Sequence, residues 1–156
     1  MSLEVGDKIP NVDLFENSPM EVVNSEELCS GKTIVLVGAP GAFTPDCTLK
    51  HLPGYVEDAD DLKARGVDEI VCVAVNDPFV MAAWGQTLGA SGKVRMLADP
   101  MAAFAKAVDL AADVPLFGTR SKRYSMVIRD GVVSELNVEP DPSAVTISAS
   151  NNLKLE

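Results

Sequence analysis

The chain has 156 residues, of which 47% are hydrophobic and 23% charged, and its formal net charge is −10. This length and composition are typical of one folded domain, and they exclude a disordered chain or a long apolar membrane segment. The negative charge repels phosphates and anionic lipids, and no long cluster of lysine and arginine offsets it. We therefore expect neither nucleic acid nor a membrane as a partner.

The chain contains three cysteines and one histidine. An odd number of cysteines, with no short spacing between any two, fits neither a disulfide framework nor a zinc site, so a reducing compartment is expected. At the N-terminus, Glu4, Asp7 and Lys8 interrupt any apolar core of a signal peptide. We expect a cytoplasmic protein, or an organellar one if a targeting peptide has been removed.

The first half of the chain predicts a parallel strand–helix–strand unit. Residues 33–37 and 69–75 are short β-branched runs, typical of buried central strands. Between them, apolar residues recur at helical spacing over 52–62 and stop at Gly66, which predicts a helix bent at Pro53. Such a unit is expected to be right-handed.

The alternation of helix and strand continues in the second half, with a helix over 78–88, a strand over 94–97 and a helix over 101–108. These elements extend the parallel part of the sheet. The functional loops of such a sheet lie beyond the carboxyl ends of its strands.

A β-hairpin is predicted from residues 124–129 and 132–138, because the intervening Asp130-Gly131 supplies the positive φ angles of a type I′ turn. A last helix is expected from about residue 143 to 153. The sheet is then mixed, and the whole chain, residues 1–156, forms one α/β domain with helices on both faces of the sheet.

The stretch VGAPGAFTPDC ends the first predicted strand and begins the next helix. Thr44 suits the N-cap and Pro45 the first helical position, so Cys47 falls at the third position. There the unpaired N–H groups and the positive end of the helix dipole favour a thiolate. This position predicts a reactive cysteine, whereas most free cysteines are small buried hydrophobes.

A lowered thiol pKa does not by itself make a fast enzyme. A drop of about three units gives roughly thirtyfold more thiolate at neutral pH, but intrinsic nucleophilicity falls by roughly twentyfold. A fast thiol enzyme must add a fixed cation and a hydroxyl that stabilise charge as the bond breaks.

The spacing Pro40-x-x-x-Thr44-x-x-Cys47 resembles the peroxidatic motif of the peroxiredoxins. The string GAFTPDCTLKHLPGYVE, followed by VNDPFVMAAWG and LNVEP, is similar to their type II subgroup, which includes peroxiredoxin 5 and the plant type II enzymes. The resemblance covers nearly the whole chain. It implies a thioredoxin-like fold and a thiol-dependent peroxidase that reduces hydrogen peroxide and alkyl hydroperoxides.

The resemblance also implies residue roles. Cys47 would attack the peroxide as a thiolate and become a sulfenic acid, and Arg123, in SKRYSMVIRDG, would hold the thiolate and the developing charge. The Thr44 hydroxyl would orient the peroxide, and Pro40 would shield the cysteine from water. No metal, nucleotide or flavin motif is present, so no cofactor is expected.

Four further positions resemble the subgroup more weakly. Leu116 and Phe117 match an apolar rim of the substrate pocket, and loop packing explains them nearly as well. The subgroup forms homodimers around the active-site helix, which would place Phe43 and Phe79 among the contacts, with core packing as the alternative.

How the sulfenic acid is resolved stays open. The animal peroxiredoxin 5 enzymes carry a resolving cysteine where this chain has Ile147, so a disulfide of that kind is excluded. The plant type II enzymes have a second cysteine that matches Cys72, which is equally typical of a buried, inert thiol. We expect an external thiol instead: glutathione, glutaredoxin or thioredoxin. Cys29 is expected to be a surface-loop thiol.

Two other functions remain as alternatives. His51 lies four residues after Cys47 on the same helix face, which would suit a cysteine–histidine hydrolase, although a polar residue at the helix edge is the simpler interpretation. A non-catalytic redox sensor would use the same thiol, but it would stop after one equivalent of peroxide.

Overall fold

The computed structural model describes residues 3–155 of the chain. Its strands are β1 (Asp13–Glu16), β2 (Ser18–Asn24), β3 (Thr33–Ala39), β4 (Glu69–Ala74), β5 (Arg95–Ala98), β6 (Ala111–Val114), β7 (Gly118–Ser121), β8 (Tyr124–Arg129) and β9 (Val132–Val138). Its helices are α1 (Ser25–Cys29), the π-helix η1 (Cys47–His51), α2 (Leu52–Ala64), α3 (Pro78–Leu88), α4 (Ala103–Ala107) and the 3₁₀-helix η2 (Ser150–Asn152).

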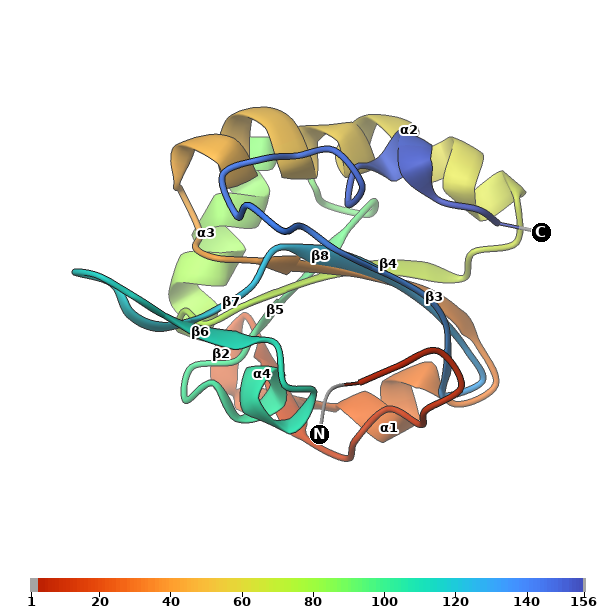
Figure 1. Cartoon of the computed structure of the whole chain (residues 1–156), viewed down its shortest axis with the longest axis horizontal. Coiled ribbons are helices and arrows are strands. Elements are labelled where there is room, and N and C mark those ends of the chain that lie inside the picture. Colours follow the sequence, from red (N-terminus) through yellow and green to blue (C-terminus); the bar gives the residue numbers. More distant parts are fainter. Residues whose placement is uncertain (1–2, 156) are drawn as a thin grey trace.

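A mixed sheet of seven strands, in the order β2-β1-β5-β4-β3-β8-β9, runs through the middle of the molecule (Figure 1). Helices α2 and α3 cover one face, and α1 and α4 cover the other. Strands β3, β4 and β5 are parallel, whereas β8 is antiparallel to β3. The hairpin of β6 and β7 forms a separate two-stranded sheet that projects from one end of the molecule.

The sheet separates two hydrophobic cores. Because successive side chains of a strand point to opposite faces, Val35 and Val37 of β3 belong to the core under α2 and α3, and Ile34 and Leu36 belong to the core over α1 and α4. A strand buried on both faces reads as a continuous apolar run, which explains the sequence of β3.

Local sequence signals predict several elements correctly. The predicted helix 78–88 is confirmed: the Asp77 side chain caps the Val80 N–H, and the helix ends at Gly89 with a φ of 67°. The predicted hairpin is also confirmed, with φ of 50° at Asp130 and 79° at Gly131. The two central strands lie where the β-branched runs predict them.

The helix expected over 143–153 is wrong, because only the single turn η2 forms there. The Glu139 carboxylate accepts hydrogen bonds from the backbone N–H and the hydroxyl of both Thr146 and Ser148. These tertiary bonds replace the intrahelical ones, and side chains of this kind favour such alternatives to a helix.

Other boundaries differ from the expectation. The helix predicted over 101–108 is confined to α4, whose first N–H groups donate to the Asp99 carboxylate. The predicted bend at Pro53 is replaced by the wider turns of η1 just before it, in which the Leu52 N–H donates to the Cys47 carbonyl. Five elements were not predicted from the sequence: β1, β2, α1, β6 and β7. Among residues 3–155, no helix is long and apolar enough to cross a membrane.

Candidate active site

The carboxyl ends of β3 and β4 and the amino end of β8 meet at one edge of the sheet. Gly38 of β3 lies opposite Tyr124 of β8, and Ala39 lies opposite Ala74 of β4. The loop that follows β3 and the residue that precedes β8 are therefore neighbours. This convergence brings Cys47 and Arg123 together across 76 positions of the chain.

The turn before the cysteine is fixed by hydrogen bonds. The Thr44 hydroxyl donates to the Gly41 carbonyl at 2.6 Å, and the Ala42 N–H donates to the Asn76 side chain, beyond β4, at 2.9 Å. The helix begins at Pro45, as the sequence predicts, and Cys47 is its third residue and is fully buried. Cys47 thus follows a hydrogen-bonded turn rather than a free loop.

Arg123 holds the sulfur. Its side chain is only 2% exposed. Nη2 donates to Cys47 Sγ at 3.2 Å, Nη1 donates to His51 Nδ1 at 3.0 Å, and Nε donates to the Pro142 carbonyl at 2.8 Å. Arg123 takes part in none of the ion pairs between residues 3–155. A buried charged group needs partners for its donors, and those of Arg123 are the Cys47 sulfur, the His51 imidazole and the Pro142 carbonyl.

His51 is 1% exposed, so its interpretation as a polar residue at the helix edge is wrong. Its Nε2 lies 3.1 Å from the Ser148 carbonyl, which only accepts, so Nε2 carries the proton and Nδ1 accepts from Arg123. Burial, and next the charge of Arg123, lower the pKa of His51 to about 4. Because both nitrogens are occupied, the imidazole positions Arg123 and is not placed to act as a base for Cys47.

A second set of bonds holds the loop that contacts His51. The Ser148 carbonyl also accepts from the Tyr55 hydroxyl at 2.6 Å, and the Ser148 N–H and hydroxyl donate to Glu139. Burial alone would raise the pKa of Glu139, but the hydrogen bonds from Ser148 and Thr146 lower it to about 2. Glu139 is therefore an anchor for this loop. Its place in the LNVEP block was the available signal, and the sequence analysis missed its role.

Pro40 follows β3 and lines a pocket of about 350 Å³, together with Val114 of β6 and Pro142. Leu116 and Phe117 do not line this pocket. They lie at the exposed turn between β6 and β7, where Leu116 has a φ of 71°. The structure therefore separates these two residues from the pocket beside Pro40.

The other two cysteines are buried. Cys72 lies in the central strand β4, and burial, followed by the negative charge of Cys47, raises the pKa of its thiol well above the usual value. Cys29 ends α1 and belongs to the core, so the expectation of a surface-loop thiol is wrong. Burial, and next the charge of Glu69, raise the pKa of Cys29 to about 11. All three cysteines are free thiols.

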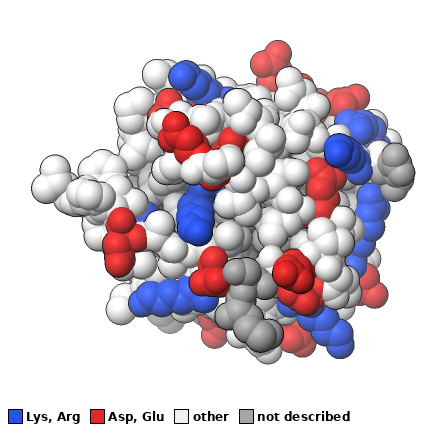
Figure 2. Space-filling model, in the orientation of Figure 1, with Lys and Arg blue, Asp and Glu red and all other residues white. Residues whose placement is uncertain are grey.

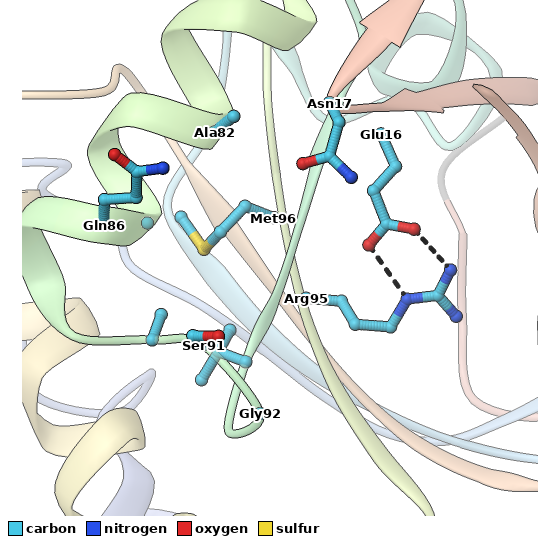
Figure 3. A pocket seen from close by; sticks show the side chains of 11 residues that line it. Glu16, Asn17, Ala82, Gln86, Ser91, Gly92, Arg95 and Met96 are labelled. Carbon is cyan, nitrogen blue, oxygen red and sulfur yellow. Dashed lines mark hydrogen bonds and ion pairs between the residues drawn. The ribbon is translucent and has the colours of Figure 1, made fainter. Parts of the chain in front are cut away.

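A second pocket lies away from the cysteine, between the end of α3 and β5 (Figure 3). Arg95 donates two hydrogen bonds to Glu16, at 2.8 and 3.1 Å, and one to Glu69 at 3.0 Å. The charges of Arg95, Glu16 and Glu69 are paired with one another, so these residues link β1, β4 and β5.

Within residues 3–155, no group of three histidine, cysteine or acidic side chains could hold a metal ion. On the face drawn in Figure 2, lysines and arginines are scattered among acidic residues.

The profile of the redoxin family matches residues 4–153 of the chain. Peroxiredoxin-2B of Arabidopsis thaliana is 40% identical over 157 residues, which cover 97% of each chain. The chloroplastic peroxiredoxin-2E-2 of Oryza sativa subsp. japonica is 42% identical over 162 residues, which cover 98% of this chain and 72% of that protein.

Solved structures agree with these relatives. Reduced Prx3 from Vibrio vulnificus superposes with a TM-score of 0.90 at 44% identity, covering 96% of this chain and 95% of that one. Peroxiredoxin 5 from Alvinella pompejana superposes with a TM-score of 0.83 at 39% identity, covering 89% and 91% of the two chains. The chain belongs to the redoxin family and is a thiol-dependent peroxidase with a thioredoxin-like fold, a peroxiredoxin of the type II and peroxiredoxin 5 group.

Proposed function

We propose that this peroxiredoxin reduces hydrogen peroxide and alkyl hydroperoxides at Cys47, and that an external thiol completes each cycle. The observation that carries the proposal is the 3.2 Å contact between Arg123 Nη2 and Cys47 Sγ in a fully buried site. A related structure supports the substrate, since Prx3 from Vibrio vulnificus, 45% identical to this chain, was solved in complex with H2O2.

The reaction splits the O–O bond of the peroxide. The Cys47 thiolate attacks the nearer oxygen, and the second oxygen leaves with the bonding electron pair and takes up a proton to become water or an alcohol. Cys47 is then a sulfenic acid. Arg123 stabilises the charge that moves from sulfur to oxygen, and it needs no reorganisation, because His51 and Pro142 already accept hydrogen bonds from its other two nitrogens, Nη1 and Nε.

Thr44 and Pro40 complete the site in this proposal. The Thr44 hydroxyl donates its hydrogen bond to the Gly41 carbonyl, so its oxygen lone pairs are free to accept a hydrogen bond from the O–H of a peroxide. Pro40 has no N–H and presents an apolar ring at the entrance, which keeps water from competing with the peroxide.

We infer that Cys72 does not resolve the sulfenic acid. A disulfide needs Cα atoms within about 7 Å and an attacking thiolate. Cys72 lies in a central strand, paired with Val37 on one side and Met96 on the other, and the raised pKa of its thiol keeps it protonated. Glutathione, glutaredoxin or thioredoxin therefore acts as the reductant.

The assembly and the compartment belong to the same proposal. Phe43, in the active-site turn, and Phe79, at the start of α3, are exposed, and exposed aromatic side chains of this kind suit a homodimer contact. Three free thiols suit a reducing compartment, in the cytoplasm or in an organelle.

The proposal is tested by turnover. With excess glutathione, the wild-type protein should consume many equivalents of hydrogen peroxide per chain, and Cys47→Ser should consume none. Cys29→Ala, which removes a thiol from the other core, is the matched control and should retain turnover. Consumption that stops after one equivalent would indicate a redox sensor, and native turnover by Cys47→Ser would contradict the proposal.

Mass spectrometry identifies the resolving step. After one equivalent of peroxide, without added thiol, Cys47 should gain one oxygen. A loss of two hydrogens would show a disulfide between Cys47 and Cys72 and would contradict external resolution.

A further inference from the structure

Arg120 of β7 lies beside the active-site turn. A Cβ atom added at Gly41 would lie 3.2 Å from Arg120 Nη1 and 3.0 Å from Thr44 Cγ2. Arg120 and Thr44 therefore flank the same glycine, although Arg120 lies in β7 and Thr44 lies in the loop after β3, far away in sequence. The guanidinium of Arg120 therefore lies beside the turn that leads to Cys47.

Two contacts with Phe117 hold the guanidinium of Arg120 in place. Its Nε donates to the Phe117 carbonyl at 3.3 Å, and its central carbon lies 5.6 Å from the centre of the Phe117 ring. These contacts fix the plane of the side chain and leave the terminal nitrogens as donors. A planar guanidinium held in this way is preorganised to bind a carboxylate.

No carboxylate of the protein takes these donors within residues 3–155, because Arg120 is absent from their ion pairs. Arg120 is paired with Ala112 across the hairpin, whereas Asp113 is paired with Thr119 and so projects from the opposite face. Asp113 accepts from the Thr119 hydroxyl there. In a protein with a net charge of −10, an anion requires a local cation of this kind.

A pocket with room for a small organic molecule is lined not by Arg120 itself but by the residues that follow it, Ser121 and Lys122. Its volume is about 350 Å³, and small-molecule pockets range from about 300 to 1,000 Å³. It runs from Pro40 along Ala112 and Val114, which share a hairpin face with Arg120, and it includes Lys122. The Glu139 carboxylate, which also borders the pocket, is occupied by Thr146 and Ser148.

We propose that Arg120 binds a carboxylate of the thiol reductant and so makes the enzyme prefer anionic thiols of low molecular weight, of which glutathione is the type. This inference rests on the proposed function, in which Cys47 becomes a sulfenic acid. The sulfur of the first thiol bonds to Cys47 sulfur, and the sulfenic oxygen leaves as water. A second thiol attacks the sulfur of the first, which releases the Cys47 thiolate and a low-molecular-weight disulfide.

The test measures the reduction of oxidised Cys47 by a thiol separately from its oxidation by peroxide. The protein is first oxidised with one equivalent of hydrogen peroxide and then mixed with glutathione or with one of three thiols of similar size: 3-mercaptopropionate, 2-mercaptoethanol or cysteamine. The rate of reduction by each thiol is measured for wild type and for Arg120→Gln. Because each comparison uses one thiol, differences between the thiols in intrinsic reactivity cancel.

Arg120→Gln should slow reduction by 3-mercaptopropionate and by glutathione about five- to tenfold relative to its effect on 2-mercaptoethanol, and high salt should shrink this difference. Arg120→Lys, which keeps the charge, should retain part of the preference. The matched control is Arg65→Gln, at the residue that follows α2, which removes the same charge from an exposed site and should not change the preference. An equal effect of Arg120→Gln on all three thiols would overturn the inference. Failure of Cys47 to react with peroxide would instead overturn the proposed function.

Discussion

The buried imidazole of His51 should make the stability of the protein depend on pH in a narrow window. His51 is the one histidine of the chain, and its pKa is lowered from 6.5 to about 4 in the folded protein. A group with a lowered pKa in the folded state binds its proton more readily when the chain unfolds. The stability is therefore fully present above pH 6.5, and it is lost as the pH falls towards 4.

The size of the effect follows from the two pKa values. Between pH 7 and pH 5, the unfolded histidine becomes almost fully protonated and the folded one stays neutral, which lowers the free energy of unfolding by about 2 kcal/mol. The lowered pKa of Glu139, at about 2, adds little here, because its ordinary value of 4.5 lies below the window.

Urea unfolding at pH 7, 6 and 5, with all thiols kept reduced, measures this dependence. Trp84 is a suitable probe, because it is buried, is the one tryptophan of the chain and donates to Thr48 of η1 at 3.0 Å. His51→Asn should be less stable than wild type at pH 7, but its stability should be nearly constant down to pH 5. A flat profile for wild type, or an equal decline in the variant, would refute the assignment.

Two further predictions concern the core and the second cysteine. Cys72→Ala should keep peroxide turnover with glutathione within about twofold of wild type, measured at saturating thiol; a loss of turnover would show that Cys72 takes part. Gly38→Ala should destabilise the protein by about 3 kcal/mol or more, measured by urea unfolding, because its Cβ would lie 2.0 Å from the buried ring of Tyr124. The matched variant Gly54→Ala, whose Cβ would lie 3.2 Å from the terminal Ser150 Oγ, should lose much less; equal losses would contradict the packing argument.

The fold could be predicted where short-range chemistry decides it. The β-branched runs give β3 and β4, and the Asp130-Gly131 pair gives the β8–β9 turn, because each signal lies within a few residues. The segment 143–153 could not be predicted in this way, because its bonds go to Glu139. The burial of Cys29 could not be predicted from the sequence either, since α1 is a single short helix without a repeating apolar pattern.

The same limit applies to the active site, where local signals predict the position of the cysteine but not its partners. The N-cap and proline signals locate Cys47 at a helix start, but nothing near Arg123 in sequence indicates what its side chain contacts, and only the family resemblance singled it out. His51 was noticed for its spacing from Cys47, yet its partners are Arg123 and the Ser148 carbonyl, 97 positions away. Contacts of this range follow from the order of the strands, which brings three strand ends to one edge of the sheet.

The central claim is that the fixed charge of Arg123 lowers the barrier to O–O cleavage and does more than ionise the sulfur. The direct test is the rate at which hydrogen peroxide oxidises Cys47 in wild type and in Arg123→Ala, followed by stopped-flow fluorescence of Trp84, at a pH high enough to ionise the thiol in both proteins. Arg123→Ala should remain about 10²- to 10³-fold slower, with Arg123→Lys in between, because one ammonium cannot replace the three directed hydrogen bonds of the guanidinium. If raising the pH restored the native rate to Arg123→Ala, this role of Arg123 would be contradicted.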